Sequence, residues 1–161
     1  MSSEADASIR AQRRGAVAIL PRPPFALVHG QKIDFSRMET LVIRRSANVA
    51  APGALCFPGG GVERDESPEQ AVCREFREEV GIDVRVVRFL AENSTPTGAP
   101  LYWFSAESVE RDPDALRIVV QQEEVAGYEW RALVDLLDDP DFLPNNLTIV
   151  RRIVAGEIAL A

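Results

Sequence analysis

The chain has 161 residues, of which 46% are hydrophobic, and its 18 Lys and Arg against 25 Asp and Glu give a formal net charge of −7. One compact domain is the natural expectation for this length. The acidic balance argues against a broad phosphate-coating surface, so no nucleic-acid polymer is expected as a partner.

Residues 1–14 mix charged and small polar side chains without an apolar stretch, which predicts a flexible tail and no secretory signal. No apolar run approaches the ~18 residues of a membrane span. The two cysteines, Cys56 and Cys73, lack any metal-ligand spacing and are expected to be free thiols. These features predict a cytoplasmic protein with no membrane partner and a single domain over residues 15–161. Its oligomeric state, monomer or homodimer, stays open.

Short apolar runs predict the strands. Gly15–Leu20 and Glu39–Arg45 are expected as buried strands, and residues 25–28 are either a further strand or part of the long connection between them. The glycine- and proline-rich stretch Pro52–Gly61 predicts a loop. Later strands are expected at residues 84–91, 101–106, 116–121 and 128–130. Strands interleaved with few helices are typical of a mixed α/β layered domain.

The clearest helix is predicted between Ser67 and Val80. Ser67 is suited to the N-cap, Pro68 to the first helical position, and Gln70 completes a capping box. Gly81 supplies the stop. The apolar side chains four residues apart, which predict the face turned to the core, are Val72, Phe76 and Val80.

The same helix carries three carboxylates, Glu75, Glu78 and Glu79, at positions i, i+3 and i+4, so they project from one face. Charges held within ~5 Å repel by about 3 kcal/mol per pair at an effective dielectric near 20. A hard divalent cation would offset this repulsion, and Mg²⁺ is the usual choice where phosphates complete the coordination. We therefore expect a magnesium site, in which Mn²⁺ can substitute. A solvated acidic helix face is the alternative interpretation of the trio alone.

The residues around the trio favour the metal site. The turn Gly59–Gly61 lets the backbone approach a ligand closely. Arg74 can pair with a carboxylate and hold it in a fixed orientation.

The stretch Gly60–Ile82 resembles the Nudix box, G-x5-E-x7-R-E-U-x-E-E-x-G-U, where U is a bulky apolar residue. Every specified position matches, and Phe76 and Ile82 fill the apolar ones. The resemblance implies an α/β fold, a Nudix-type α/β/α sandwich with a mixed β-sheet, in which the box forms a loop, a helix and a loop. It also implies a hydrolase that cleaves the diphosphate link of a small nucleotide-like substrate in the presence of Mg²⁺.

The resemblance assigns roles within the box. It makes Glu75, Glu78 and Glu79 metal ligands and catalytic residues, with Arg74 and Glu66 as supports for the loop and helix. Arg45, Gly59 and Gly60 are expected to bind substrate.

A further acidic residue from a later loop often binds metal or acts as general base in this family. Glu123 and Glu124 both precede the strand expected at residues 128–130. Glu124 is the favoured candidate because it lies six residues before Trp130, as such a glutamate does in MutT-type members. An ordinary polar strand end is the alternative. The general base is expected to be Glu75 or Glu124.

The segment Phe142–Asn146 resembles one in MutT-type enzymes in which an asparagine reads a purine edge, the place that Asn146 takes here. A short helix is expected at residues 132–137 and a terminal helix at residues 147–154. Asparagine favours the N-cap, so Asn146 either caps that helix or reads a base, and Asn145 can be the cap in the second case. The favoured substrate is a (d)NTP or modified purine nucleotide.

Other substrate classes leave partial traces. Arg45, Ser46, Gly53 and Phe57-Pro58 loosely resemble a coenzyme A pyrophosphatase signature, and Pro96 resembles a marker of ADP-ribose pyrophosphatases. A non-catalytic Nudix-like nucleotide sensor and an acidic scaffold domain are alternatives of other classes. The intact box favours an enzyme over both.

Overall fold

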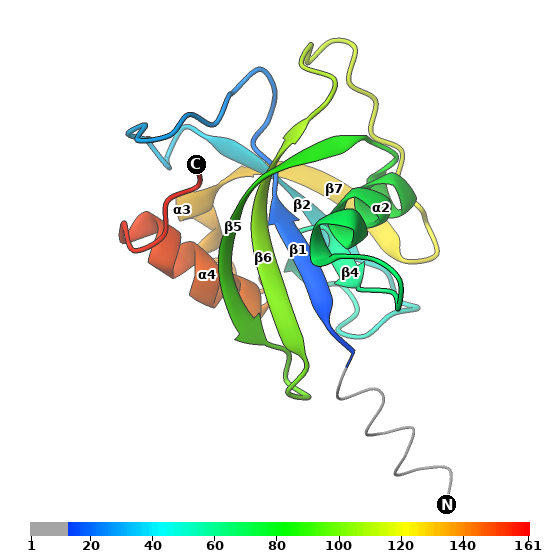
Figure 1. Ribbon diagram of the computed structural model, residues 1–161. Coiled ribbons are helices and arrows are strands. Elements are labelled where there is room, and N and C mark those ends of the chain that lie inside the picture. Colours follow the sequence, from blue (N-terminus) through cyan, green and yellow to red (C-terminus); the bar gives the residue numbers. More distant parts are fainter. Residues whose placement is uncertain (1–12) are drawn as a thin grey trace, which may run out of the picture.

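The computed structural model describes residues 13–161 (Figure 1), so most of the tail predicted at residues 1–14 lies outside the described part. The strands in chain order are β1 (Gly15–Ile19), β2 (Glu39–Arg45), β3 (Leu55–Cys56), β4 (Gly59–Gly61), β5 (Val84–Ser94), β6 (Pro100–Ser108) and β7 (Val125–Ala132). The helices are α2 (Pro68–Val80), α3 (Leu133–Leu136) and α4 (Pro144–Val154). No described helix has both the length and the apolar character needed to cross a membrane.

The strands form two sheets. A four-stranded sheet has the order β4-β1-β6-β5, in which β1 runs parallel to β6 and the other neighbours are antiparallel. A three-stranded antiparallel sheet has the order β3-β2-β7. Helix α2 lies on one side of the sheets and α3 and α4 on the other (Figure 1). The predicted mixed-sheet sandwich is confirmed.

Strand β1 is buried on both faces. Ala16 and Ala18 belong to the core beneath α2, whereas Val17 and Ile19 belong to the core beneath α4. Successive side chains of a strand point to opposite faces, so a strand covered on both sides is apolar throughout. This explains why a continuous apolar run, rather than an alternating one, forms the central strand.

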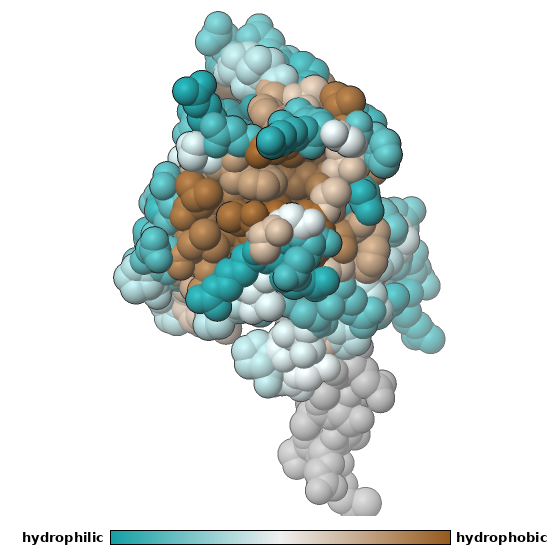
Figure 2. Space-filling view, turned by 90° about the vertical axis from the view of Figure 1, so that its left-hand side faces the viewer, coloured by the Kyte–Doolittle hydropathy of each residue, from teal (hydrophilic) through white to brown (hydrophobic). Residues whose placement is uncertain are grey.

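The core beneath α4 reaches the molecular surface. Partly buried apolar side chains from the connection after β1, from β5 and from α4 pack against it, and Figure 2 shows apolar side chains gathered on that side of the molecule. They include Phe25, Leu27, Ile33, Phe35, Leu90, Leu147 and Val154.

Two strand predictions need correction. The stretch Pro52–Gly61 is not a loop throughout, because it contains β3 and β4. A Cβ at Gly59 would lie 2.7 Å from the Cα of Val17, so glycine is what lets β4 approach β1 closely enough to pair.

Conversely, residues 116–121 form no strand. Their backbone donors turn to the end of α2, where Val119 N donates to Val80 O at 3.0 Å and Gln121 N donates to Glu79 O at 2.9 Å. Apolar alternation predicted pairing with a strand, but the partner is a helix terminus with unsatisfied carbonyl groups. Residues 25–28 likewise form no strand and are part of the connection.

Candidate active site

The sequence dictates where α2 begins and ends. Ser67 accepts a hydrogen bond from Gln70 N at 3.1 Å, and the Gln70 side chain accepts one from Ser67 N at 2.8 Å, which completes the predicted capping box. Gly81 ends the helix in the left-handed conformation at φ 71°. Val72, Phe76 and Val80 are fully buried, so the predicted core stripe is confirmed. The helix face next to this stripe therefore turns to the glycine strand β4.

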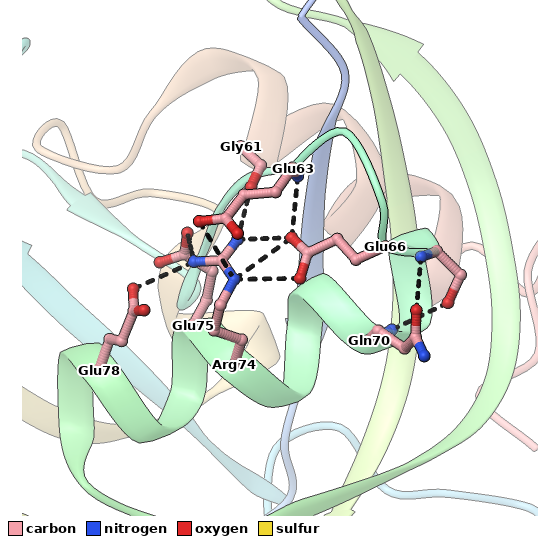
Figure 3. A network of polar contacts seen from close by, with 8 residues as sticks. Gly61, Glu63, Glu66, Gln70, Arg74, Glu75 and Glu78 are labelled. Carbon is pink, nitrogen blue, oxygen red and sulfur yellow. Dashed lines mark hydrogen bonds and ion pairs between the residues drawn. The ribbon is translucent and has the colours of Figure 1, made fainter.

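Arg74 is the centre of a charged network on α2 (Figure 3). Its guanidinium donates to Glu66 at 2.6–3.2 Å, to Gly61 O at 2.8 Å, and to Glu75 and Glu78 at 3.0 Å each. The bond from Arg74 holds the pKa of Glu66 below its usual value. Glu66 also accepts from Glu63 N at 2.9 Å, so it ties the loop after β4 to the helix. Arg74 and Glu66 thus connect the loop after β4 to the helix.

Two carboxylates of the same helix are buried. Glu75 is 9% exposed and Glu79 is 6% exposed, whereas the side chain of Glu78 is 56% exposed. Burial, and next the negative charge of Glu75, raise the pKa of Glu79 well above its usual value. Burial also raises the pKa of Glu75, although Arg74 opposes the shift. The buried pair is therefore desolvated and mutually repelling.

The glycine strand fits these carboxylates closely. Gly59 N donates to Glu79 Oε1 at 2.8 Å. A Cβ at Gly60 would lie 2.5 Å from the carboxyl carbon of Glu75, so any larger residue would displace that group. The predicted need for glycine here is explained by the carboxylate and the neighbouring strand.

Glu124 lies in the turn before β7, and its charge contributes to the raised pKa of both Glu75 and Glu79. The turn is anchored by Ser46 N, which donates to Glu124 O at 2.9 Å, and by Ser46 Oγ, which donates to Glu123 O at 2.6 Å. The side chain of Glu124 is exposed. The structure thus brings Glu124 near the box carboxylates from a distant part of the chain.

This donor set fits a hard divalent cation. The charges of two desolvated carboxylates and of Glu124 repel one another, and no described Lys, Arg or His forms an ion pair with Glu79. Within residues 13–161 no group of three or more Asp, Glu, Cys or His side chains is gathered closely enough to hold a metal ion. In general Mg²⁺ keeps several waters and takes only one or two protein carboxylates alongside substrate phosphates.

A cleft of about 340 Å³ lies beside the glycine strand. Arg45 lines it, with its Nη1 4.0 Å from Cys56 Sγ, and the charge of Arg45 partly offsets the raised pKa of Glu79. Burial raises the pKa of the Cys56 thiol to about 11. Apolar side chains line the same space, namely Val17, Phe57, Leu101 and Leu143. The cleft therefore offers both an apolar wall and positive charge next to the buried carboxylates.

Asn146 also lines the cleft, but it is not a helix cap. Helix α4 begins at Pro144 with Leu143 at the N-cap and no side-chain capping bond, so the predicted start at residue 147 and the capping interpretation are wrong. Asn146 is 4% exposed; its Oδ1 accepts from Phe57 N and its Nδ2 donates to Asn145 Oδ1, both at 2.9 Å. A proline at the first helical position sets the boundary earlier than an asparagine cap would.

The sequence did not identify several residues of the cleft. Arg13 and Arg14 line it, although they were assigned to the tail, and Thr95 and Thr97 reach it from the turn between β5 and β6. The position of these arginines directly before the buried strand β1 could have indicated their place in the cleft. The start of a central strand lies at the same edge of the sheet as the turn that leads into its parallel neighbour, here β6.

Several solved structures share this fold. A MutT protein from Methanosarcina mazei Go1 superimposes with a TM-score of 0.67 at 20% identity, over 91% of this chain and 95% of that one. The E. coli ORF135 protein superimposes with a TM-score of 0.63 at 22% identity, over 91% of each chain. At these identities the likeness shows the fold, which this chain shares with structures named as MutT and Nudix proteins.

Sequence comparisons give the family. The NUDIX domain model matches residues 33–153. The 8-oxo-dGTP diphosphatase of Escherichia coli (strain K12) is 35% identical over 118 residues, covering 71% of this chain and 85% of that protein. The NAD-capped RNA hydrolase NudC of Stutzerimonas stutzeri is 33% identical over 120 residues, but the chain spans only 40% of its length. The chain belongs to the Nudix hydrolase family and is an enzyme of that family.

Proposed function

We propose that this Nudix pyrophosphohydrolase cleaves a (d)NTP or a modified purine nucleoside triphosphate to the monophosphate and pyrophosphate. The observation that carries the proposal is the pair of buried carboxylates, Glu75 and Glu79, held against the glycine strand at the edge of the cleft. The E. coli relative named for 8-oxo-dGTP covers most of this chain and supports a purine triphosphate as substrate.

Glu75, Glu78, Glu79 and Glu124 would hold Mg²⁺, with Mn²⁺ able to substitute. The ion, when bound, neutralises phosphate charge and lowers the pKa of a coordinated water. The chain's own residues then orient the reaction. Arg74 fixes the carboxylate of Glu75 through a 3.0 Å bond, and Gly59 N fixes that of Glu79.

Hydrolysis requires a base for the attacking water. As the water oxygen forms its bond to phosphorus, the bridging P–O bond of the anhydride breaks and the water proton passes to a glutamate. We assign that role to Glu124, because its side chain is exposed and no described cation pairs with it, whereas Glu75 is bound by Arg74. Glu124→Gln should reduce kcat by about 10²-fold or more.

Glu123→Gln is the matched control for Glu124, since both side chains are exposed in the same turn. It should leave the rate within twofold. Equal losses for the two variants would assign the turn a structural role and return the base to Glu75.

The direct test of the activity is a nucleotide screen in Mg²⁺ that measures pyrophosphate release and identifies the nucleotide product. Hydrolysis of purine triphosphates to monophosphate and pyrophosphate, abolished by excess chelator, is the expected result. Binding of nucleotides without turnover would instead make the protein a sensor, and full activity in chelator would remove the metal assignment. Faster turnover of coenzyme A or ADP-ribose than of triphosphates would identify that compound as the substrate instead.

We further propose that Asn146 contributes to purine preference. It lies in the cleft wall next to Phe57 and Leu143, and after its bonds to Phe57 N and Asn145 its amide keeps one N–H and one acceptor position. Asn146→Ala should narrow the ratio of kcat/KM between purine and pyrimidine triphosphates about tenfold, as for a lost hydrogen bond of 1–3 kcal/mol.

Asn93→Ala is the control for that substitution. Asn93 accepts from Trp103 Nε1 at 2.7 Å and donates to Asn145 O at 3.2 Å, so it belongs to the same polar chain but does not line the cleft. It should lower Tm without changing base preference. If Asn146→Ala behaves the same way, Asn146 only positions Phe57 and the base-reading proposal fails.

A further inference from the structure

Two arginines outside the Nudix box are fixed to the glycine strand. Arg13 and Arg14 directly precede β1, whose first residue, Gly15, is paired with Gly61 of β4. Val62 N donates to Arg14 O at 2.8 Å, which extends this pairing by one residue. The backbone that carries both arginines is therefore held beside the box.

Their side chains lie at the Gly61 end of the strand. A Cβ on Gly61 would lie 2.6 Å from Arg13 Nε and 3.0 Å from its Cζ, so the guanidinium rests on that glycine. Gly61 is the residue whose carbonyl accepts from Arg74. The Arg14 guanidinium lies 6.0 Å from the centre of the Tyr102 ring, within the range of a cation–π contact.

Positive charge is thus present at both ends of the glycine strand. Arg45 lies toward Cys56 and Glu79 at the Gly59 end, and Arg13 lies at the Gly61 end. A strand rises about 3.3 Å per residue, so these ends are separated by about 7 Å. More than one phosphate group can lie along that span.

These arginines are not paired with carboxylates of the described residues. None of Arg13, Arg14 and Arg45 forms an ion pair with a carboxylate of residues 13–161, although the whole chain has a net charge of −7. All three line the same cleft, together with Thr95 and Thr97. Positive charge that has no ion-pair partner in a concave site attracts anions.

We propose that Arg13 and Arg14, with the hydroxyl groups of Thr95 and Thr97, form a basic subsite for a phosphate group other than the two joined by the scissile link. The inference rests on the proposed function and specifies its substrate. Two sources share this chemistry: the terminal phosphate of a nucleoside triphosphate and the 3′ phosphodiester of a short nucleotide chain.

The test compares three substrates that have the same first base: the diphosphate, the triphosphate and a 5′-triphosphorylated dinucleotide. Steady-state kinetics are measured for the wild type, Arg13→Gln and Arg14→Gln. The control is Arg151→Gln, which removes an exposed arginine of α4 that does not line the cleft and should leave all three KM values within twofold. Circular dichroism and melting check that each variant is folded.

Arg13→Gln should raise KM for one of the larger substrates about tenfold relative to the next smaller one, as expected for a lost charge-assisted hydrogen bond. An increase in KM with the triphosphate but not with the diphosphate assigns the subsite to the terminal phosphate. An increase in KM with the dinucleotide alone assigns the subsite to the internucleotide phosphate. Equal penalties on all three substrates, or none, would overturn the subsite.

A second measurement separates this inference from the proposed function. If the wild type hydrolyses none of the three substrates, the proposed function fails. Calorimetric titration with inorganic triphosphate then tests the subsite alone. Weaker binding by Arg13→Gln than by Arg151→Gln supports it, and equal dissociation constants would reject it.

Discussion

Glu66, in the loop bound by Arg74 of α2, and Glu79, on α2 itself, have opposite electrostatic surroundings. Glu66 accepts two kinds of bond, from the Arg74 guanidinium and from a backbone N–H, and its pKa is lowered. Glu79 is buried, receives a single backbone bond from Gly59 and faces the charge of Glu75, and its pKa is raised. The first carboxylate is stabilised by the fold, whereas the second is held against an electrostatic cost.

The difference separates structural charge from functional charge. Ion pairs around Arg74 connect the loop to the helix, and they need no ligand. Glu79 has no ion-pair partner among the described residues, and Glu75 shares Arg74 with Glu66 and Glu78. A divalent cation with substrate phosphates would supply the missing positive charge. A raised pKa from burial and a like charge is the pattern that marks functional carboxylates.

The largest effect is expected on the buried apolar face of α2. Phe76→Asp or Val72→Asp places a charge where the native side chain is fully buried in a hydrophobic cluster, at a cost of several kcal/mol. We expect loss of cooperative unfolding in denaturant titrations and no soluble native fraction. The exposed substitution Glu69→Asp on the same helix is the control and should melt like the wild type. Normal melting of either core variant would contradict the assigned helix orientation.

A smaller loss is expected when the Arg74 network is broken. Arg74→Lys keeps the charge but cannot reproduce the simultaneous bonds to Glu66, Gly61 O and Glu75, and should reduce the free energy of unfolding by about 2–3 kcal/mol. Arg77→Lys is the matched control, because the Arg77–Asp83 pair is more than 60% exposed on both sides. It should cost less than about 1 kcal/mol. Equal losses measured by urea unfolding would remove the distinction between network and surface pair.

The pH dependence of stability should show the two carboxylates acting in opposite directions. The pKa of Glu66 is below its ordinary 4.5, so its contribution is present above pH 4.5 and is lost as pH falls through the folded value. The pKa of Glu79 is above 4.5, so the metal-free protein loses stability as pH rises from 4.5 toward the folded value.

Glu66→Gln should therefore flatten the acid side of the profile, and Glu79→Gln should flatten the loss on raising pH. Each pKa unit of difference corresponds to about 1.4 kcal/mol. Urea midpoints in chelator between pH 3.5 and 8 measure both slopes. Parallel profiles for the two variants would contradict the opposite pKa shifts of Glu66 and Glu79.

Local rules predicted α2 well because its start, face and stop depend on residues within the helix. Ser67, Gln70 and Gly81 act on neighbouring backbone groups, and the box spacing fixes which carboxylates share a side. By contrast, β4 and residues 116–121 were mispredicted, since their hydrogen-bond partners are β1 and the end of α2, far away in sequence.

The same limit applies to the site. Spacing indicated Glu75 and Glu79 but not which carboxylate is buried, and it could not bring Arg13 to the cleft, because that depends on the pairing of Gly15 with Gly61. The segment Phe142–Asn146 indicated Asn146 as a candidate, yet its bond to Phe57 N depends on tertiary packing.

The most direct test of the account measures stability and activity on one variant, Glu79→Gln. Gln can still accept from Gly59 N but carries no charge, so Tm in chelator at pH 7 should rise by about 2–4 °C, the shift that about 1 kcal/mol produces in a domain of this size. With Mg²⁺, kcat/KM should fall about 10²-fold or more. Glu78→Gln, at an exposed position bound to Arg74, should lose activity without the gain in Tm. If Tm and activity of Glu79→Gln fall together, or if activity persists, Glu79 is not a buried charge kept for a cation.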